Sequence, residues 1–213
     1  MRISSAATLT LCAALLLLTA NSYAGTDGMT RVHTSFQRDD LDAPTFEIAT
    51  ESAYMLGVFG NPHAYEYATQ FITARLRWGA VHSSGWMRGY NQVYFLGMGG
   101  WFIRGLENHY FGISTGLRYN FVQPGSRWRP YISGGVGLGD VDATRERTRG
   151  ALGQNLTFNI LTAIGVSYEW NDHWKLTGGI LYEHLSNAGL SEPERPNSSL
   201  NLLGPQFGAT YSF

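Results

Sequence analysis

The chain has 213 residues, 15 basic and 16 acidic side chains, and a formal net charge of −1. This balance gives no electrostatic reason to expect a nucleic-acid partner. The single cysteine excludes a fold held by intrachain disulfides.

The first 24 residues differ from the rest of the chain. Arg2 is their only charge, residues 9–20 are largely apolar, and Ser22 and Ala24 supply small side chains before Gly25. This pattern predicts a secretory signal peptide, residues 1–24, cleaved after Ala24. The apolar run is short for a transmembrane helix, which needs about 20 mainly apolar residues. Since Cys12 lies in this segment, the mature chain would contain no cysteine.

A polar N-terminal segment, residues 25–44, is followed by stretches of alternating apolar and small or polar residues. Period-two alternation between turn-rich stretches predicts β-strands. The predicted strands are 45–57, 65–80, 92–105, 110–122, 129–143, 155–170, 174–187 and 200–213. The chain is therefore predicted to be all-β.

The two faces of these strands differ in side-chain size. In 110–122, one face carries Phe111, Ile113, Thr115, Leu117, Tyr119 and Phe121, and the other carries Gly112, Ser114, Gly116, Arg118 and Asn120. A soluble sandwich would place long charged residues on its second face. A small, polar face suits the crowded interior of a narrow barrel instead. We therefore predict that residues 45–213 form an eight-stranded antiparallel transmembrane β-barrel of the bacterial outer membrane, with its apolar band toward lipid.

The end of the chain supports this prediction. Alternation continues to the last residue, and Tyr211 and Phe213 resemble the C-terminal assembly signal of bacterial outer-membrane barrels. The resemblance implies the barrel assembly machinery as a partner. The alternative is a soluble domain that ends on a buried strand. In the barrel, 142–153 and 188–199 would be external loops, and 123–126 and 171–173 periplasmic turns. The stretch 81–90 is longer than expected for such a turn.

The stretch YEHLSNAGL, residues 182–190, places polar residues on the apolar face of the seventh strand. Because successive side chains alternate, His184 and Ser186 share the outward face of Trp174 and Leu176. A histidine beside a serine can accept the hydroxyl proton and activate the oxygen as a nucleophile. The alternative is a pair of polar residues at the membrane interface.

Residues 184–190, HLSNAGL, resemble the signature of outer-membrane lipid A 3-O-deacylases of the PagL type. In that family an H-x-S-N motif ends the penultimate strand of an eight-stranded barrel. Residues 116–139 resemble the family's middle hairpin, so the resemblance covers about 116–213. It implies that Ser186 is the nucleophile, His184 the general base and Asn187 a residue that helps bind the oxyanion.

The resemblance also implies an orienting residue for the histidine at the start of the last strand. Position counting gives Ser198, but the preceding loop is longer here, and PNSSLNLLG resembles the N-P-G-x-N-x-x-G of relatives. Aligned in this way, Asn201 occupies the place of an acid. An asparagine can hold an imidazole tautomer but adds no charge. Glu192 and Glu194 are the alternatives, while Glu183 is predicted to face the lumen.

The function implied is that of a lipid A deacylase, a serine esterase that hydrolyses the 3-position ester-linked 3-hydroxyacyl chain. Lipid A or lipopolysaccharide would be its substrate, and no metal or cofactor is expected. Arg145, Arg147 and Arg149 lie in a predicted external loop and are candidates to contact lipid A phosphates, or ordinary charges of a solvated loop. The remaining histidines lack metal-ligand spacing. The alternative function is a non-catalytic barrel that acts as an adhesin or structural protein.

Overall fold

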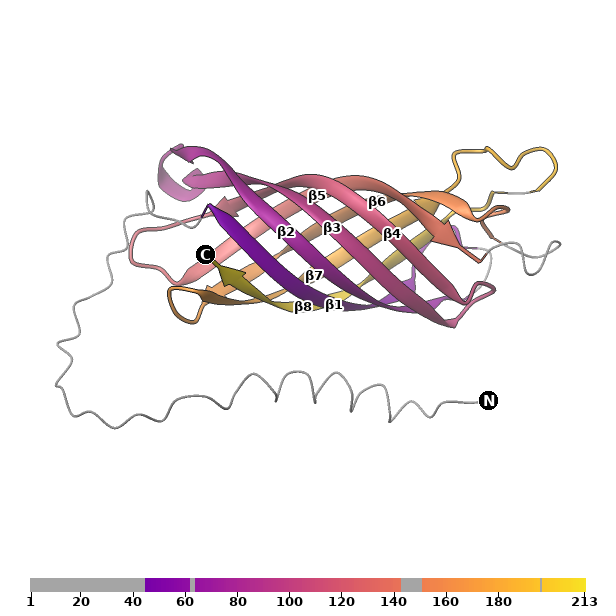
Figure 1. Cartoon of the computed structure of the whole chain (residues 1–213), viewed down its shortest axis with the longest axis horizontal. Coiled ribbons are helices and arrows are strands. Elements are labelled where there is room, and N and C mark those ends of the chain that lie inside the picture. Colours follow the sequence, from indigo (N-terminus) through magenta and orange to yellow (C-terminus); the bar gives the residue numbers. More distant parts are fainter. Residues whose placement is uncertain (1–44, 62–63, 143–150, 196) are drawn as a thin grey trace. The chain divides into compact units, whose positions relative to one another are not determined.

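The chain forms a closed antiparallel barrel in which each strand pairs with its neighbours in sequence and β1 closes onto β8 (Figure 1). This computed structural model describes residues 45–61, 64–142, 151–195 and 197–213. The strands are β1 Phe46–Gly57, β2 Glu66–His82, β3 Gly89–Arg104, β4 His109–Phe121, β5 Trp128–Val141, β6 Leu156–Glu169, β7 Trp174–Ser186 and β8 Leu200–Ser212. The predicted fold class is confirmed. The predicted signal peptide and the segment 25–44 lie outside the described residues.

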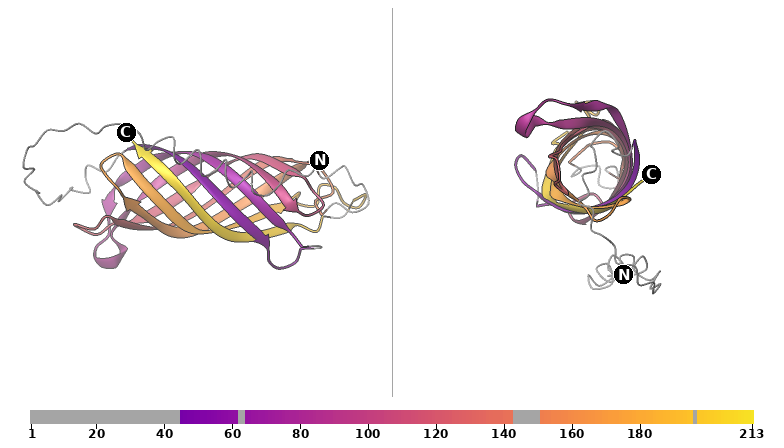
Figure 2. Two further views of the ribbon diagram at one scale, coloured as in Figure 1. Left: turned by 90° about the horizontal axis from the view of Figure 1, so that it is seen from below. Right: turned by 90° about the vertical axis from the view of Figure 1, so that its left-hand side faces the viewer.

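The connections separate into two sets at opposite ends of the barrel (Figure 2). The turn end holds the C-terminus and the connections 83–88, 122–127 and 170–173. The loop end holds the described residues of the other connections: 58–61, 64–65, 105–108, 142, 151–155, 187–195 and 197–199. The described parts of the long connections predicted at 142–153 and 188–199 therefore share one end, opposite the short turns.

The connection between β2 and β3 is shorter than the sequence suggested. Both strands extend into the stretch 81–90, which leaves a short 3-10 helix, Gly85–Met87, at the reversal. Ser83 and Gly85 have φ values of 66° and 61°, in the left-handed region that tight turns use. The backbone therefore turns within a few residues.

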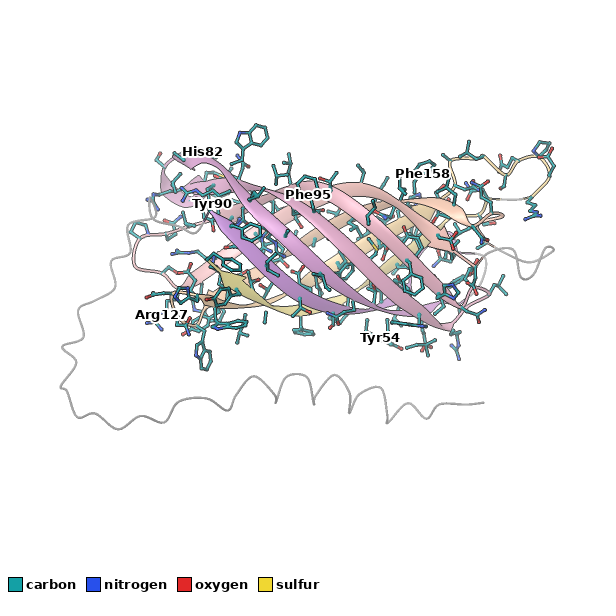
Figure 3. The ribbon with its side chains drawn as sticks, in the orientation of Figure 1. Tyr54, His82, Tyr90, Phe95, Arg127 and Phe158 are labelled. Atoms are coloured by element: carbon teal, nitrogen blue, oxygen red, sulfur yellow. The ribbon has the colours of Figure 1, made fainter. Side chains whose placement is uncertain are left out.

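Alternation along the strands divides apolar side chains outside from small and polar ones inside. Ile113, Ile164 and Phe207 are 63%, 58% and 65% exposed on the outer wall. Figure 3 shows such side chains around the whole wall and labels Phe95 and Phe158 among them. A wall of this kind can face lipid, because every strand edge is paired. Within the described residues, no helix is long and apolar enough to span a membrane.

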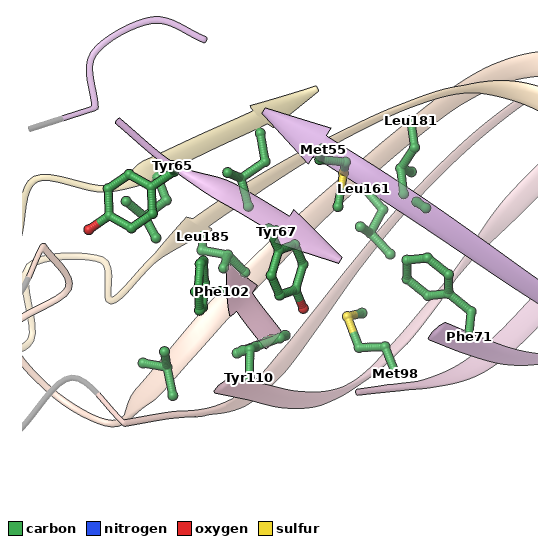
Figure 4. Packing of buried hydrophobic residues seen from close by; sticks show 14 of the residues in the cluster. Met55, Tyr65, Tyr67, Phe71, Met98, Phe102, Tyr110, Leu161, Leu181 and Leu185 are labelled. Carbon is green, nitrogen blue, oxygen red and sulfur yellow. The ribbon is translucent and has the colours of Figure 1, made fainter. Parts of the chain in front are cut away.

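Side chains of two kinds fill the lumen. Toward the turn end, Lys175 pairs with Glu47, Arg75 donates to Glu51 at 2.6 Å, and the guanidinium of Arg118 lies 3.6 Å from the ring centre of Tyr131. Toward the loop end the filling is mainly apolar (Figure 4); it includes Met55, Tyr67, Phe71, Met98, Phe102, Tyr110, Leu181 and Leu185. The polar outer-wall residues described next thus lie on a wall whose inner side is filled with side chains.

Candidate active site

His184 lies on the outer wall near the loop end of β7. Its strand alternates between exposed or half-buried and buried positions, and His184 is half-buried on the side of Trp174, Leu176 and Ile180. In the sheet it stands directly opposite Asn201 of β8. In the structure, His184 and Ser186 therefore face outward, as the alternation predicted.

Asn201 accepts a hydrogen bond from the imidazole. The Nδ1 of His184 lies 2.9 Å from Oδ1 of Asn201, and Nδ2 of Asn201 donates to the carbonyl oxygen of Phe59 at 2.9 Å. Because a carbonyl can only accept, the nitrogen of the amide must face Phe59 and its oxygen must face His184. Nδ1 therefore carries the proton, and Nε2 presents a lone pair, as a general base requires.

The amide of Asn201 is held from several sides. Tyr182 donates its hydroxyl proton to Oδ1 of Asn201 at 2.7 Å. Asn61 brackets the backbone of Asn201: its Nδ2 donates to the Asn201 carbonyl at 3.0 Å, and its Oδ1 accepts from the Asn201 N–H at 2.7 Å. Although Asn201 belongs to the outward face of β8, it is only 9% exposed, since these neighbours cover it.

Ser186 ends β7 on the face of His184, two residues further on. Its Oγ accepts hydrogen bonds from Nδ2 of Asn197 at 3.0 Å and from the backbone N–H of Ala188 at 3.2 Å. Within the described part of the chain, no hydrogen bond joins His184 to Ser186. Catalytic hydrogen bonds are often long without substrate and tighten in the reacting complex. The two side chains follow each other on one face of the same strand, two positions apart.

Asn187 is used differently from what the sequence suggested. Its side chain is fully buried, and Nδ2 donates to the Leu152 carbonyl and to Oγ of Ser191, both at 2.6 Å. Its Oδ1 accepts from the N–H of Gly189 at 2.8 Å. Both amide protons are thus engaged in holding the β7–β8 loop. The donors that reach Ser186 are Asn197, which sequence reasoning missed, and the Ala188 backbone.

The acidic candidates do not reach the imidazole. Glu192 and Glu194 are exposed in the β7–β8 loop, and Asn201 occupies Nδ1 of His184. Glu183 faces the lumen as predicted, fully buried and with neither carboxyl oxygen hydrogen-bonded in the described structure. The predicted lipid A-binding residues Arg145, Arg147 and Arg149 lie outside the described residues.

The described residues contain no group of three or more His, Cys, Asp or Glu side chains that could hold a metal ion. The site therefore consists of an imidazole, a hydroxyl, two side-chain amides and a backbone N–H. These groups can activate an oxygen nucleophile and donate to a developing oxyanion.

Comparison with known proteins gives one family and several similar folds. The family model described as lipid A 3-O-deacylase (PagL) matches residues 63–210. The crystal structure of the outer membrane enzyme PagL aligns with a TM-score of 0.54 at 18% identity, covering 76% of this chain and 97% of that one. That of Neisserial surface protein A (NspA) aligns with a TM-score of 0.53 at 13% identity, covering 79% and 97%. No curated protein sequence matches the chain.

Proposed function

The chain belongs to the lipid A 3-O-deacylase (PagL) family, and from this premise we propose that it is a serine esterase of the outer membrane. Its substrate is lipid A, and the bond that it hydrolyses is the ester of the 3-hydroxyacyl chain at the 3-position. The observation that carries this proposal is the outward-facing His184, whose Nδ1 is held by Asn201 while Ser186 follows on the same face.

In the reaction, Oγ of Ser186 attacks the ester carbonyl while Nε2 of His184 takes the hydroxyl proton. The tetrahedral intermediate collapses, the bond to the sugar oxygen breaks, and His184 returns the proton to that oxygen. The acyl chain is then bound to Ser186 as an ester. Water, deprotonated by His184, attacks this ester, and His184 returns that proton to Oγ of Ser186 as the fatty acid leaves. Asn201 keeps Nδ1 protonated throughout both steps.

Asn197 and the Ala188 backbone are the proposed oxyanion donors. Both donate to Oγ of Ser186, at 3.0 and 3.2 Å, so both N–H groups lie beside the atom that attacks and are the nearest donors for the carbonyl oxygen of a bound ester. A donor of this kind contributes about 2.7–4 kcal/mol to transition-state stabilisation. Asn187 supports them indirectly, because its buried amide fixes the loop that carries Ala188.

The position of the site suits a lipid substrate. Phe158, opposite Ser186 on β6, and Leu203, opposite Tyr182 on β8, are each 39% exposed on the outer wall. An acyl chain can therefore remain against apolar side chains while its ester reaches Ser186. Contact of Arg145, Arg147 and Arg149 with lipid A phosphates, and insertion by the barrel assembly machinery, are further predictions from the sequence.

A non-catalytic surface barrel is the second candidate function. It is favoured by the likeness to Neisserial surface protein A, whose TM-score equals that of the enzyme to within 0.01. The fold alone therefore does not separate the two. Such a barrel gives no reason to hold an outward imidazole in one tautomer, whereas an esterase requires it.

The test compares lipid A from cells that express wild type, Ser186→Ala or Ser126→Ala. Ser126 lies in a turn at the opposite end of the barrel, so its variant is the matched control. Mass spectrometry should show loss of one hydroxyacyl chain with wild type and Ser126→Ala, and intact lipid A with Ser186→Ala. Fragmentation should locate the loss at the 3-position. Identical spectra from wild type and Ser186→Ala, with both folded, would overturn the proposal.

A further inference from the structure

The short segment Val58–Asn61, which follows β1, wraps around Asn201 of β8. The Val58 N–H donates to the Asn201 carbonyl at 3.0 Å, the Phe59 carbonyl accepts from Nδ2 of Asn201 at 2.9 Å, and Asn61 makes two further bonds to the Asn201 backbone. We call this the 58–61 segment. It joins the first strand of the barrel to the residue that orients His184.

An asparagine in this role has a weakness that a carboxylate lacks. The two ends of a carboxylate are equivalent, so either oxygen accepts from the imidazole. A carboxamide that rotates by half a turn presents its NH₂ group instead. Nδ1 of His184 would then have to accept, the proton would move to Nε2, and no unprotonated Nε2 would remain to take the hydroxyl proton of Ser186. An asparagine therefore works here only if its orientation is fixed.

The Phe59 carbonyl supplies this fixed orientation. It can only accept a hydrogen bond, so it selects the rotamer in which Nδ2 points away from His184. On the other end of the amide, the Tyr182 hydroxyl donates to Oδ1 and adds a second preference for the same orientation. A flipped amide would lose the bond to the Phe59 carbonyl, oppose two oxygens there, and set a donor against the imidazole.

Asn61 in turn ties the segment that carries the Phe59 carbonyl to the backbone of Asn201. Its side chain imitates a neighbouring strand, because Nδ2 donates to the Asn201 carbonyl and Oδ1 accepts from the Asn201 N–H. The ladder between β1 and β8 ends at the pair Gly57 and Leu202, and the Val58 N–H and the Asn61 side chain together continue it to Asn201. Gly60, with φ of +70°, lets the chain reverse so that Phe59 and Asn61 both face Asn201.

We propose that Asn61 is a positioning residue that locks the amide of Asn201 in the orientation that keeps Nε2 of His184 unprotonated. The 58–61 segment thereby allows an asparagine to orient the imidazole. A carboxylate in the same place would need no such segment, because its two oxygens are equivalent. This inference rests on the proposed esterase function. It assigns to the connection after β1 a part in a reaction whose other groups belong to β7, β8 and the loop between them.

The first test measures kcat and KM of purified protein in detergent micelles with lipid A as substrate. Asn61→Ala should lower kcat on the order of 10-fold and leave KM unchanged, because misplaced catalytic groups lower the rate without removing substrate contacts. Asn108→Ala is the control: this loop-end asparagine bonds Asp142 at 2.6 Å and should keep wild-type kcat. The electrophoretic shift between folded and heat-denatured barrel monitors folding of each variant.

The second test combines Asn61→Ala with Asn201→Asp. A carboxylate needs no orientation lock, so Asn61→Ala should lower kcat by less than about 2-fold in the Asn201→Asp background, as a double-mutant cycle reveals. The same loss in both backgrounds would show a structural role for Asn61 and overturn the inference.

A third measurement keeps the inference testable if Asn201→Asp fails to fold. The ¹⁵N chemical shifts of His184 should show the Nδ1-protonated tautomer in wild type and a rise of the Nε2-protonated form in Asn61→Ala. Unchanged shifts with unchanged kcat would contradict the inference. Failure of the esterase proposal is separately visible, since Ser186→Ala would then retain activity while the tautomer shift still appears.

Discussion

The two faces of β7 carry polar groups in opposite ways. On the lumen face, Lys175 is charged, fully paired with Glu47 and surrounded by other strands, near the turn end. On the outer face, His184 and Ser186 are bonded to neutral amides that come from β8 and the loop-end connections. The lumen group holds the barrel together through strand contacts, whereas the outer group depends on loops for its geometry.

This difference has a physical cause. In the lumen, two opposite charges compensate each other in a space closed to lipid. On a lipid-facing wall a bare carboxylate is costly, whereas an amide with all its hydrogen bonds made is tolerated. Asn201, in the place where the family resemblance suggests an acid, fits this requirement: Phe59, Asn61, Tyr182 and His184 satisfy its side chain and backbone.

The largest expected effect comes from removing the base on the outer face. His184→Ala should lower kcat for lipid A deacylation by roughly 10³-fold or more, because the nucleophile Ser186 and the base His184 act together. The barrel should still fold, since the half-buried imidazole contributes no lumen contact. Released fatty acid, measured with purified protein, checks the prediction. A variant that retains more than a tenth of wild-type kcat would contradict it.

Breaking the pair of Lys175 and Glu47 in the lumen should have the opposite effect: it should lower stability and leave kcat unchanged. Lys175→Met leaves Glu47 buried without its cation and should lower the free energy of unfolding by about 3–5 kcal/mol. The double variant Lys175→Met with Glu47→Gln should recover much of this loss, because no unpaired charge remains. Urea unfolding in lipid vesicles measures both. We expect kcat of the folded fraction to stay near that of wild type. This result would show that the lumen pair stabilises the barrel and takes no part in catalysis.

Glu183 is another acidic residue on the lumen face, and unlike Glu47 it has no hydrogen-bond partner in the described structure. Its carboxyl group is fully buried. Glu183→Leu should therefore raise the free energy of unfolding by about 1–3 kcal/mol, the cost of an unsatisfied buried polar group. Glu183→Gln should give a smaller change, because it keeps a polar group. A destabilised Glu183→Leu barrel would show that the carboxyl group has a partner in the membrane.

The smallest effect is expected at a loop-end contact remote from the site. Burial alone would raise the pKa of Asp142, but hydrogen bonds from Asn108 and His109 outweigh it and lower the pKa below 3.8. The folded pKa is depressed, so this stabilisation is present above the unfolded pKa and is lost as pH falls through the folded one. Between pH 5 and 2, wild type should lose slightly more thermal stability than Asp142→Asn, by calorimetry. Parallel curves would contradict this.

Much of the fold is encoded in local alternation and could be predicted. In β6, Leu161 and Thr162 depart from the apolar-outside pattern, yet the strand keeps its alternation through them, because neighbouring strands fix its register. The reversal at 83–88 was expected to be longer, since a left-handed φ at Ser83 is not evident from the residue type.

Only the part of the candidate site that lies on the paired strands β7 and β8 could be predicted from the sequence. His184 and Asn201 are opposite each other across β7 and β8, and alternation places both on the outer wall. Asn61 contacts Asn201 across 140 positions of sequence, by closure of the barrel. Asn197 reaches Ser186 through the loop conformation, and Asn187 turns into the loop. Such contacts follow from three-dimensional closure and carry no short-range sequence signal.

The central claim is that the outward-facing Ser186 is a nucleophile activated by His184. Its most direct test is covalent labelling of the purified barrel with a long-chain alkyl fluorophosphonate, followed by peptide mass spectrometry. The account predicts one adduct, on Ser186, that forms at least 10-fold more slowly in His184→Ala and abolishes lipid A deacylation as it accumulates. Deacylation that continues while Ser186 is fully labelled, or equal labelling rates in wild type and His184→Ala, would contradict it.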